Sequence, residues 1–102
     1  MILEGDNYIG KGLKLKIDID GEGFNQSTGE YTVEAICGNK SHTYTKEDIY
    51  EDDGEYYLGI DTSYFKAGTL KLIITALIPD EAFPNGIRKE IDVKTIGILK
   101  TP

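Results

Sequence analysis

The sequence predicts an all-β fold, an antiparallel β-sandwich of about seven short strands, on three observations. Isoleucine, valine and threonine together number 25, against 13 for alanine, leucine and methionine, and β-branched residues favour pleated strands. Apolar residues recur with a period of two along several segments, which is the pattern of half-buried strands. Turns rich in glycine, asparagine and aspartate separate these segments, and none has apolar residues at helical spacing over three turns.

The clearest strand covers residues 13–19, where four aliphatic side chains alternate with charged ones. Residues 31–37 alternate in the same way, and the turn chemistry of residues 38–41 predicts a hairpin to a short strand over 42–45. A further half-buried strand over 56–61 follows an acidic turn. Between these strands, residues 45–51 are mostly charged and predict one helical turn at most.

The longest alternation covers residues 70–78 and is partly apolar on both faces, which predicts a central strand. Pro79 ends it because proline lacks the backbone donor, and residues 80–86 form a loop. The last strand opens at Ile87, with Ile87, Ile91 and Val93 in one phase, and its apolar phase then switches to Ile96 and Ile98. Because such a slip turns every later side chain to the other face, a bulge or bend is expected between residues 95 and 97.

Two predictions, one on the core and one on the architecture, follow from this pattern. The expected core consists of the aliphatic positions in phase on these strands: Leu13, Leu15, Ile17, Ile19, Val33, Leu58, Ile60, Leu70, Leu72, Ile74, Ile91 and Val93. A closed barrel is the alternative to the sandwich.

Composition limits the classes of protein that fit. With 102 residues, 39% of them apolar and 28% charged, the chain fits a single folded domain over 1–102 and is too apolar for a disordered protein. A net charge of −7 disfavours nucleic acid and anionic membranes as partners. No apolar window is long enough to span a membrane, and the start lacks the pattern of a signal peptide. Synthesis in the cytoplasm is therefore expected.

The lone cysteine and the lone histidine exclude an intramolecular disulfide and a zinc site. Cys37 and His42 flank the predicted turn, so a hairpin could place them opposite each other as nucleophile and base. Cys37, however, shares the phase of core residues, where a thiol has a raised pKa. The sequence therefore favours a structural role for Cys37.

Acidic residues gather in two segments without a complete metal motif. Asp18, Asp20 and Glu22 occupy the first, third and fifth positions of a calcium loop, but the twelfth is Gly29 where the loop needs a bidentate glutamate. The second segment, residues 47–55, is expected to be a solvated loop. No catalytic residue, cofactor or metal is predicted, because the carboxylates lie on polar strand faces or in loops and so small a domain leaves little room for a cleft.

Tyr57 and Gly59 are the candidate contact residues for a partner. An outward aromatic beside a glycine could receive a partner's side chain or backbone. The alternative is that Tyr57 covers the strand at Gly59 or meets an aromatic side chain of a neighbouring strand.

The stretch Gly54-Glu-Tyr-Tyr-Leu-Gly-Ile-Asp-Thr-Ser-Tyr-Phe-Lys-Ala-Gly68-Thr-Leu-Lys-Leu forms a strand, a short polar corner and an Ala-Gly-x-aliphatic strand. With Gly5-Asp6 before the first strand and the loop around Pro84-Asn85-Gly86, this order resembles the N-terminal immunoglobulin-like domain of phage baseplate upper proteins and small proteins encoded in Bacteroides prophages. The paired cysteines and core tryptophan of antibody domains are missing.

The resemblance implies a non-catalytic structural or adaptor module of a virion or prophage, contacting other tail proteins or further copies of itself. The alternative is a carbohydrate- or cell-surface-binding module that uses exposed tyrosines as a sugar platform.

Overall fold

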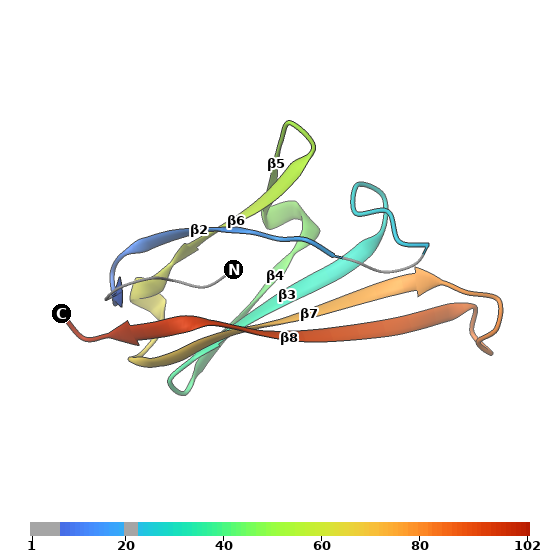
Figure 1. Cartoon of the computed structure of the whole chain (residues 1–102). Helices are drawn as coiled ribbons and strands as arrows, with labels where there is room; N and C mark the ends of the chain where they lie inside the picture. Colours follow the sequence, from blue (N-terminus) through green and yellow to red (C-terminus); the bar gives the residue numbers. More distant parts are fainter. Residues whose placement is uncertain (1–6, 20–22) are drawn as a thin grey trace.

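The computed structural model describes residues 7–19 and 23–102, and 62% of these lie in strands and 6% in helix. The all-β prediction is therefore confirmed. The strands are β1 (Asn7–Tyr8), β2 (Gly12–Lys16), β3 (Glu30–Cys37), β4 (Lys40–Thr45), β5 (Ile49–Asp52), β6 (Glu55–Asp61), β7 (Gly68–Pro79) and β8 (Ile87–Lys100) (Figure 1). Two 3₁₀ turns, η1 (Lys46–Asp48) and η2 (Thr62–Tyr64), complete the described elements.

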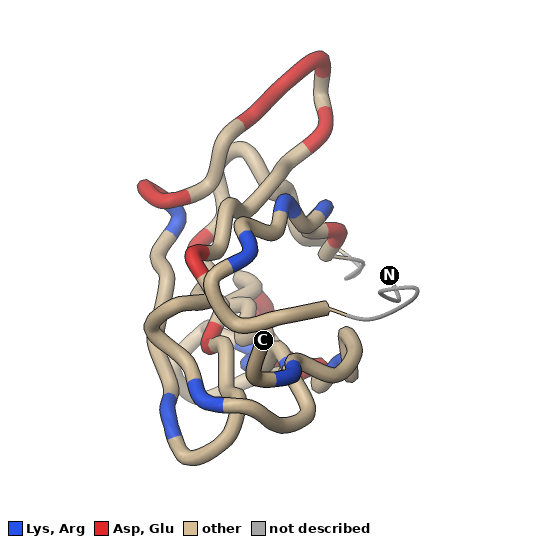
Figure 2. Tube along the Cα trace, turned by 90° about the vertical axis from the view of Figure 1, so that its left-hand side faces the viewer, with Lys and Arg blue, Asp and Glu red and all other residues tan. Residues whose placement is uncertain are grey.

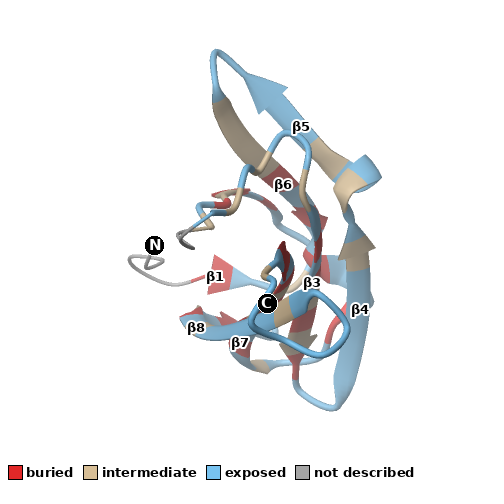
Figure 3. Cartoon of the chain, turned by 90° about the vertical axis from the view of Figure 1, so that its right-hand side faces the viewer, coloured by how far each residue is buried: buried red, intermediate tan, exposed pale blue. Residues whose placement is uncertain are grey.

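The strands form a five-stranded sheet in the order β1-β8-β7-β3-β4 and a three-stranded sheet in the order β2-β6-β5. All neighbours pair antiparallel except β1 and β8, which pair in parallel through Asn7–Leu99 and Tyr8–Lys100. The expectation of a wholly antiparallel fold was wrong at this edge. The chain changes sheet between β1 and β2, between β2 and β3, between β4 and β5 through η1, and between β6 and β7 through η2. The sheets curve around one interior (Figure 3).

Residues of both sheets form one buried cluster, as the alternation predicted. Nine of the twelve expected core residues are buried: Leu13, Leu15, Ile17, Val33, Leu58, Ile60, Leu70, Leu72 and Ile74. Ile19 packs against the cluster while partly buried. Leu70, Leu72 and Ile74 lie on β7, the central strand of the larger sheet, as predicted.

The first half of β8 contradicts the core prediction. Ile91 and Val93 are 60% and 58% exposed, and Ile96 is buried in their place. The register explains the reversal, because Leu72 and Ile74, which are buried, pair with Lys94 and Asp92. The charged side chains of this half therefore share the core side of the sheet, and its aliphatic side chains lie on the outer side.

The expected bulge in β8 is confirmed. Gly97 pairs with Leu70 and Thr95 pairs with Lys71, so Ile96 is the extra residue on β8. The bulge changes the phase of the strand, so Ile96 at the bulge and Leu99 beyond it are core residues. Ile98, expected in the core phase with Ile96, is 58% exposed, because the extra residue turns it to the outer side.

Two short elements, β5 and η2, were not predicted. The segment expected to hold at most one helical turn does hold one, η1, whose Asp48 side chain accepts a hydrogen bond from the Thr45 N–H at 2.8 Å. It then continues as β5, a strand that the acidic sequence concealed. The Asp61 side chain caps η2 by accepting a hydrogen bond from the Ser63 N–H.

Thr62 joins η2 to the turn between β1 and β2. Its buried Oγ1 donates a hydrogen bond to the Lys11 carbonyl at 2.6 Å and accepts one from the Gly10 N–H at 2.9 Å. Thr62→Val leaves both backbone groups without this partner, so we expect a loss of about 1–3 kcal/mol in the free energy of unfolding, measured with urea. The matched control is Thr69→Val on an exposed position of β7, and equal losses in the two variants would contradict the role of the hydroxyl group.

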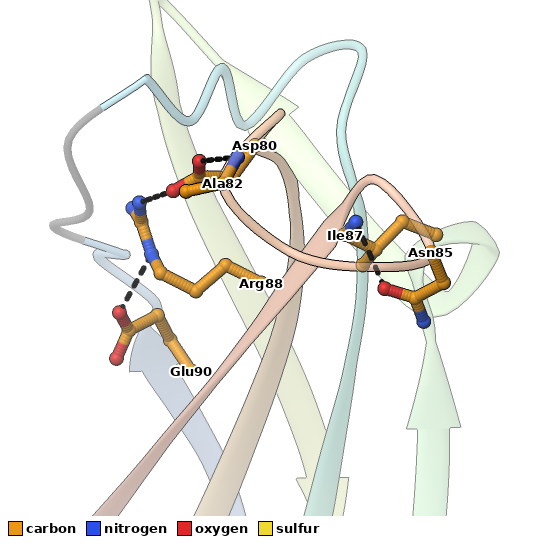
Figure 4. A network of polar contacts seen from close by, with 6 residues as sticks. All are labelled: Asp80, Ala82, Asn85, Ile87, Arg88 and Glu90. Atoms are coloured by element: carbon orange, nitrogen blue, oxygen red, sulfur yellow. Dashed lines mark hydrogen bonds and ion pairs between the residues drawn. The ribbon is translucent and has the colours of Figure 1, made fainter.

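The loop between β7 and β8 is held by side-chain hydrogen bonds (Figure 4). Asp80 accepts one from the Ala82 N–H at 2.9 Å and one from Arg88 at 2.6 Å, and Arg88 also bonds Glu90. Asn85 accepts one from the Ile87 N–H. The loop therefore has a defined shape, at an end of the hairpin that projects beyond the neighbouring strands (Figure 1).

These contacts predict a loss of stability in acid. The Ala82 N–H and then the Arg88 guanidinium lower the pKa of Asp80 below its ordinary 3.8. A carboxylate with a depressed folded-state pKa contributes stability above its unfolded-state value, and this contribution disappears as the pH falls through the folded-state pKa. We expect Asp80→Asn to flatten the decline of the melting temperature below pH 3.8. An unchanged decline would contradict this role.

Candidate functional site

The predicted contact residues Tyr57 and Gly59 lie two positions apart on β6, in the smaller sheet. Tyr57 is partly buried, pairs with Lys16 on one side and Tyr50 on the other, and lies under the Lys14 ammonium group, 4.6 Å from the ring centroid. The pairing with Tyr50 fits the alternative interpretation, in which Tyr57 meets a neighbouring aromatic residue. Gly59 is exposed, and no atom lies within 4 Å of the position where a Cβ would stand.

Gly59 belongs to a shallow notch of about 280 Å³, which we call the aromatic notch. Its lining comes from the edge of β4, the end of β6 and η2: His42, Tyr44, Gly59, Asp61 and Tyr64. The sequence named Gly59 alone as a contact residue in this group. His42 and Tyr44 alternate along β4, and this spacing could have indicated that both side chains face the same side of the strand. Nothing in the local sequence indicated that Tyr64 lies beside them in the notch.

The three rings of the notch contact one another at steep angles. The His42 and Tyr44 centroids are 4.6 Å apart at 65°, and those of His42 and Tyr64 are 5.7 Å apart at 69°. His42 and Tyr44 pair with Ala35 and Val33, so they occupy the core side of an edge strand. The Tyr64 hydroxyl donates a hydrogen bond to the Ser41 carbonyl at 3.0 Å, which joins η2 to β4.

The charge of the notch is set by Asp61. The hydroxyl and the backbone N–H of Ser63 donate hydrogen bonds to its carboxylate at 2.6 and 3.0 Å, and they lower the pKa of Asp61. Burial, followed by the negative charges of Asp48 and Asp61, raises the pKa of Tyr44. At neutral pH the notch therefore combines a phenol with an ionised carboxylate.

A second candidate surface follows the first half of β8. Three aliphatic residues of β8 and one of the neighbouring β7 lie on the outer side of the sheet and are between 37% and 60% exposed. We call them the aliphatic ridge: Ile87, Ile91 and Val93 of β8 and Leu77 of β7. On the core side of β8, charges follow in the order Arg88, Glu90, Asp92 and Lys94. Among the described residues, only β1 pairs with the outer edge of β8, at Leu99 and Lys100, and no described strand pairs with this edge between Lys89 and Ile98.

The structure separates Cys37 from His42. Cys37 pairs with Lys40, whereas His42 pairs with Ala35, because the turn consists of Gly38 and Asn39. Cys37 is fully buried, and burial raises the pKa of its thiol. The arrangement therefore provides no nucleophile and base at this hairpin.

The acidic segments have different positions. In the calcium-like run, Asp20 and Glu22 lie outside the described residues. The second cluster surrounds the β5–β6 turn (Figure 2), where Glu55 binds Lys16 at 2.7 Å. Within residues 7–19 and 23–102, no group of three His, Cys, Asp or Glu side chains is arranged to hold a metal ion.

No helix in the described part of the chain is long and apolar enough to cross a membrane. Comparisons of the sequence and the structure with protein-family models, curated proteins and solved structures gave no match.

Proposed function

We propose that the chain is an immunoglobulin-like β-sandwich module that acts without catalysis, as a tail or baseplate adaptor of a phage or prophage particle. Two sheets around one core support the sandwich. The single observation that supports contact as the function is the first half of β8, where the aliphatic ridge lies beside a strand edge with which no described strand pairs between Lys89 and Ile98. Such an edge accepts a strand from another protein, and exposed aliphatic side chains add apolar contact.

The partner in this proposal is an extended segment of another particle protein. The core side of β8 presents Arg88, Glu90, Asp92 and Lys94, in the charge order plus, minus, minus, plus. Arg88 already bonds Asp80 and Glu90, and Lys94 lies 3.6 Å from Asp92. Because charges paired within the chain add little attraction for a partner, a matching strand presents polar side chains opposite this run, with aliphatic side chains on its other face.

The charge order disfavours pairing with a second copy of this chain in the antiparallel register that aligns residues 87–95 of the two β8 strands. In an antiparallel pair of β8 strands that overlaps residues 87–95 completely, Arg88 meets Lys94 and Glu90 meets Asp92 of the other copy. Like charges directly opposite each other destabilise a strand pair. Self-association is thus an outcome of the test and not the proposal.

The test is to induce the prophage in the host, purify the particles and quantify this chain by mass spectrometry. We expect the unmodified chain in the particles, and we expect Ile91→Lys combined with Val93→Lys to reduce its incorporation at least about tenfold, because both side chains lie in the contact. Both residues are exposed, so the variant should fold. Tyr50→Lys, at a position that is 62% exposed on β5, is the matched control.

Two outcomes would overturn the proposal. Absence of the chain from particles, together with saturable binding to a polysaccharide that Tyr57→Ala abolishes, would assign the carbohydrate-binding alternative. Dimers that disappear in the β8 variant, with no particle protein bound, would assign self-association.

A further inference from the structure

The aromatic notch combines features that suit one class of group. Three rings from β4 and η2 meet beside the Asp61 carboxylate, in a depression of about 280 Å³. We propose that the notch binds the cationic side chain of a partner protein, with arginine fitting best. This inference rests on the proposed adaptor function and specifies the chemistry of a contact distant from the aliphatic ridge in the sequence and in the sheet order.

The electrostatics of the notch favour a cation. The faces of aromatic rings carry partial negative charge, and a guanidinium within about 6 Å of a ring centroid is attracted to them. Asp61 adds a full negative charge, since the Ser63 hydrogen bonds hold its carboxylate ionised. The chain's own Lys40 already lies near the site, with Nζ 5.7 Å from the Tyr64 centroid.

The ring geometry disfavours a sugar as the ligand. A sugar stacks its C–H groups on one flat, exposed aromatic face, whereas His42 meets Tyr44 and Tyr64 at 65° and 69°. Because His42 is tilted steeply against both tyrosine rings, its ring is not coplanar with either of them and the three do not form one flat platform. A planar guanidinium also donates paired hydrogen bonds to a carboxylate, which Asp61 can accept.

The backbone beside the notch can bind the rest of a peptide. Tyr56 accepts a hydrogen bond from Ile17 on the β2 side, so alternation directs the backbone groups of Gly59 to the opposite side of β6. There β5 begins at Ile49, opposite Leu58, and no described strand pairs with β6 at Gly59. The missing side chain of Gly59 leaves space for a peptide backbone to approach.

The experiment is a titration of the ¹⁵N-labelled protein followed by NMR. The probes are an acetylated and amidated Gly-Arg-Gly peptide, the same peptide with citrulline in place of arginine, and a neutral β-glucan oligosaccharide. We expect the arginine peptide to shift the amide signals of Thr43, Gly59 and Asp61 saturably. Citrulline has the shape of arginine without its charge, so its peptide should bind at least about tenfold more weakly.

Variants of the notch residues test whether the arginine peptide binds at the notch. Tyr64→Ala should weaken the affinity for the arginine peptide about 3- to 30-fold through loss of the ring. Asp61→Asn should weaken it as well, while its amide oxygen still accepts the Ser63 hydrogen bonds that cap η2. Tyr64→Phe keeps the ring and should retain binding, and Tyr50→Ala on the surface of β5 is the control outside the notch.

Equal binding of the arginine and citrulline peptides, or shifts that avoid the notch, would overturn the inference. Saturable binding of the glucan that Tyr64→Ala abolishes would assign the notch to carbohydrate. Particle incorporation distinguishes the two proposals: a chain that enters particles but ignores the arginine peptide refutes the notch alone. A chain that binds the peptide but is absent from particles refutes the adaptor.

Discussion

Leu72→Ala is expected to lower the free energy of unfolding by about 2–5 kcal/mol, measured by urea denaturation. Leu72 is 2% exposed and lies on β7, between β3 and β8, where it pairs with Ala35 and Lys94. Strands on both sides restrict β7, so the structure relaxes little around the cavity that the substitution leaves.

Ile91→Ala is the matched control for this prediction. Ile91 is also an aliphatic residue of the β7–β8 hairpin, but its side chain is largely exposed, so its truncation should cost less than about 1 kcal/mol. A loss below about 0.5 kcal/mol for Leu72→Ala, or a larger loss for Ile91→Ala, would contradict the register of β8.

Gly38→Ala is expected to cost about 2–4 kcal/mol, because two penalties add at the turn between β3 and β4. Gly38 has φ +67°, in the left-handed region. A Cβ at this position would stand 2.7 Å from the Lys66 Cβ and 3.0 Å from the Lys66 carbonyl oxygen, both of which are fixed by the chain. Gly68 contacts the same turn from β7, so the backbone has little room to move.

Gly54→Ala separates the two penalties. Gly54 has a similar φ of +78° in the β5–β6 turn, but nothing lies within 4 Å of a Cβ built there. Its substitution should cost only the conformational penalty, about 1–2 kcal/mol. Thermal or urea unfolding of both variants tests the difference, and equal losses would contradict a close approach at Gly38.

The candidate site was harder to predict from the sequence than the fold. Gly59 was identified because it lies beside the outward-facing Tyr57, and the structure places it at the aromatic notch. Tyr57, selected by the same reasoning, lies under Lys14. Tyr44 and Tyr64 are 20 positions apart, and both come to line the notch because η2 follows β6 at the edge where β4 ends the larger sheet.

The sequence by itself determined the all-β class, the core phase of β2, β3, β6 and β7, and the bulge in β8. These features depend on local alternation, since a strand places successive side chains on opposite faces. The tertiary structure alone decided which face of β8 is inward, because alternation defines two faces without saying which one meets the core. Pairing with β7 places Asp92 beside Ile74 and leaves Ile91 exposed. The parallel pairing of β1 and the meeting of β4 with η2 were decided in the same way, by contacts between residues far apart in the chain.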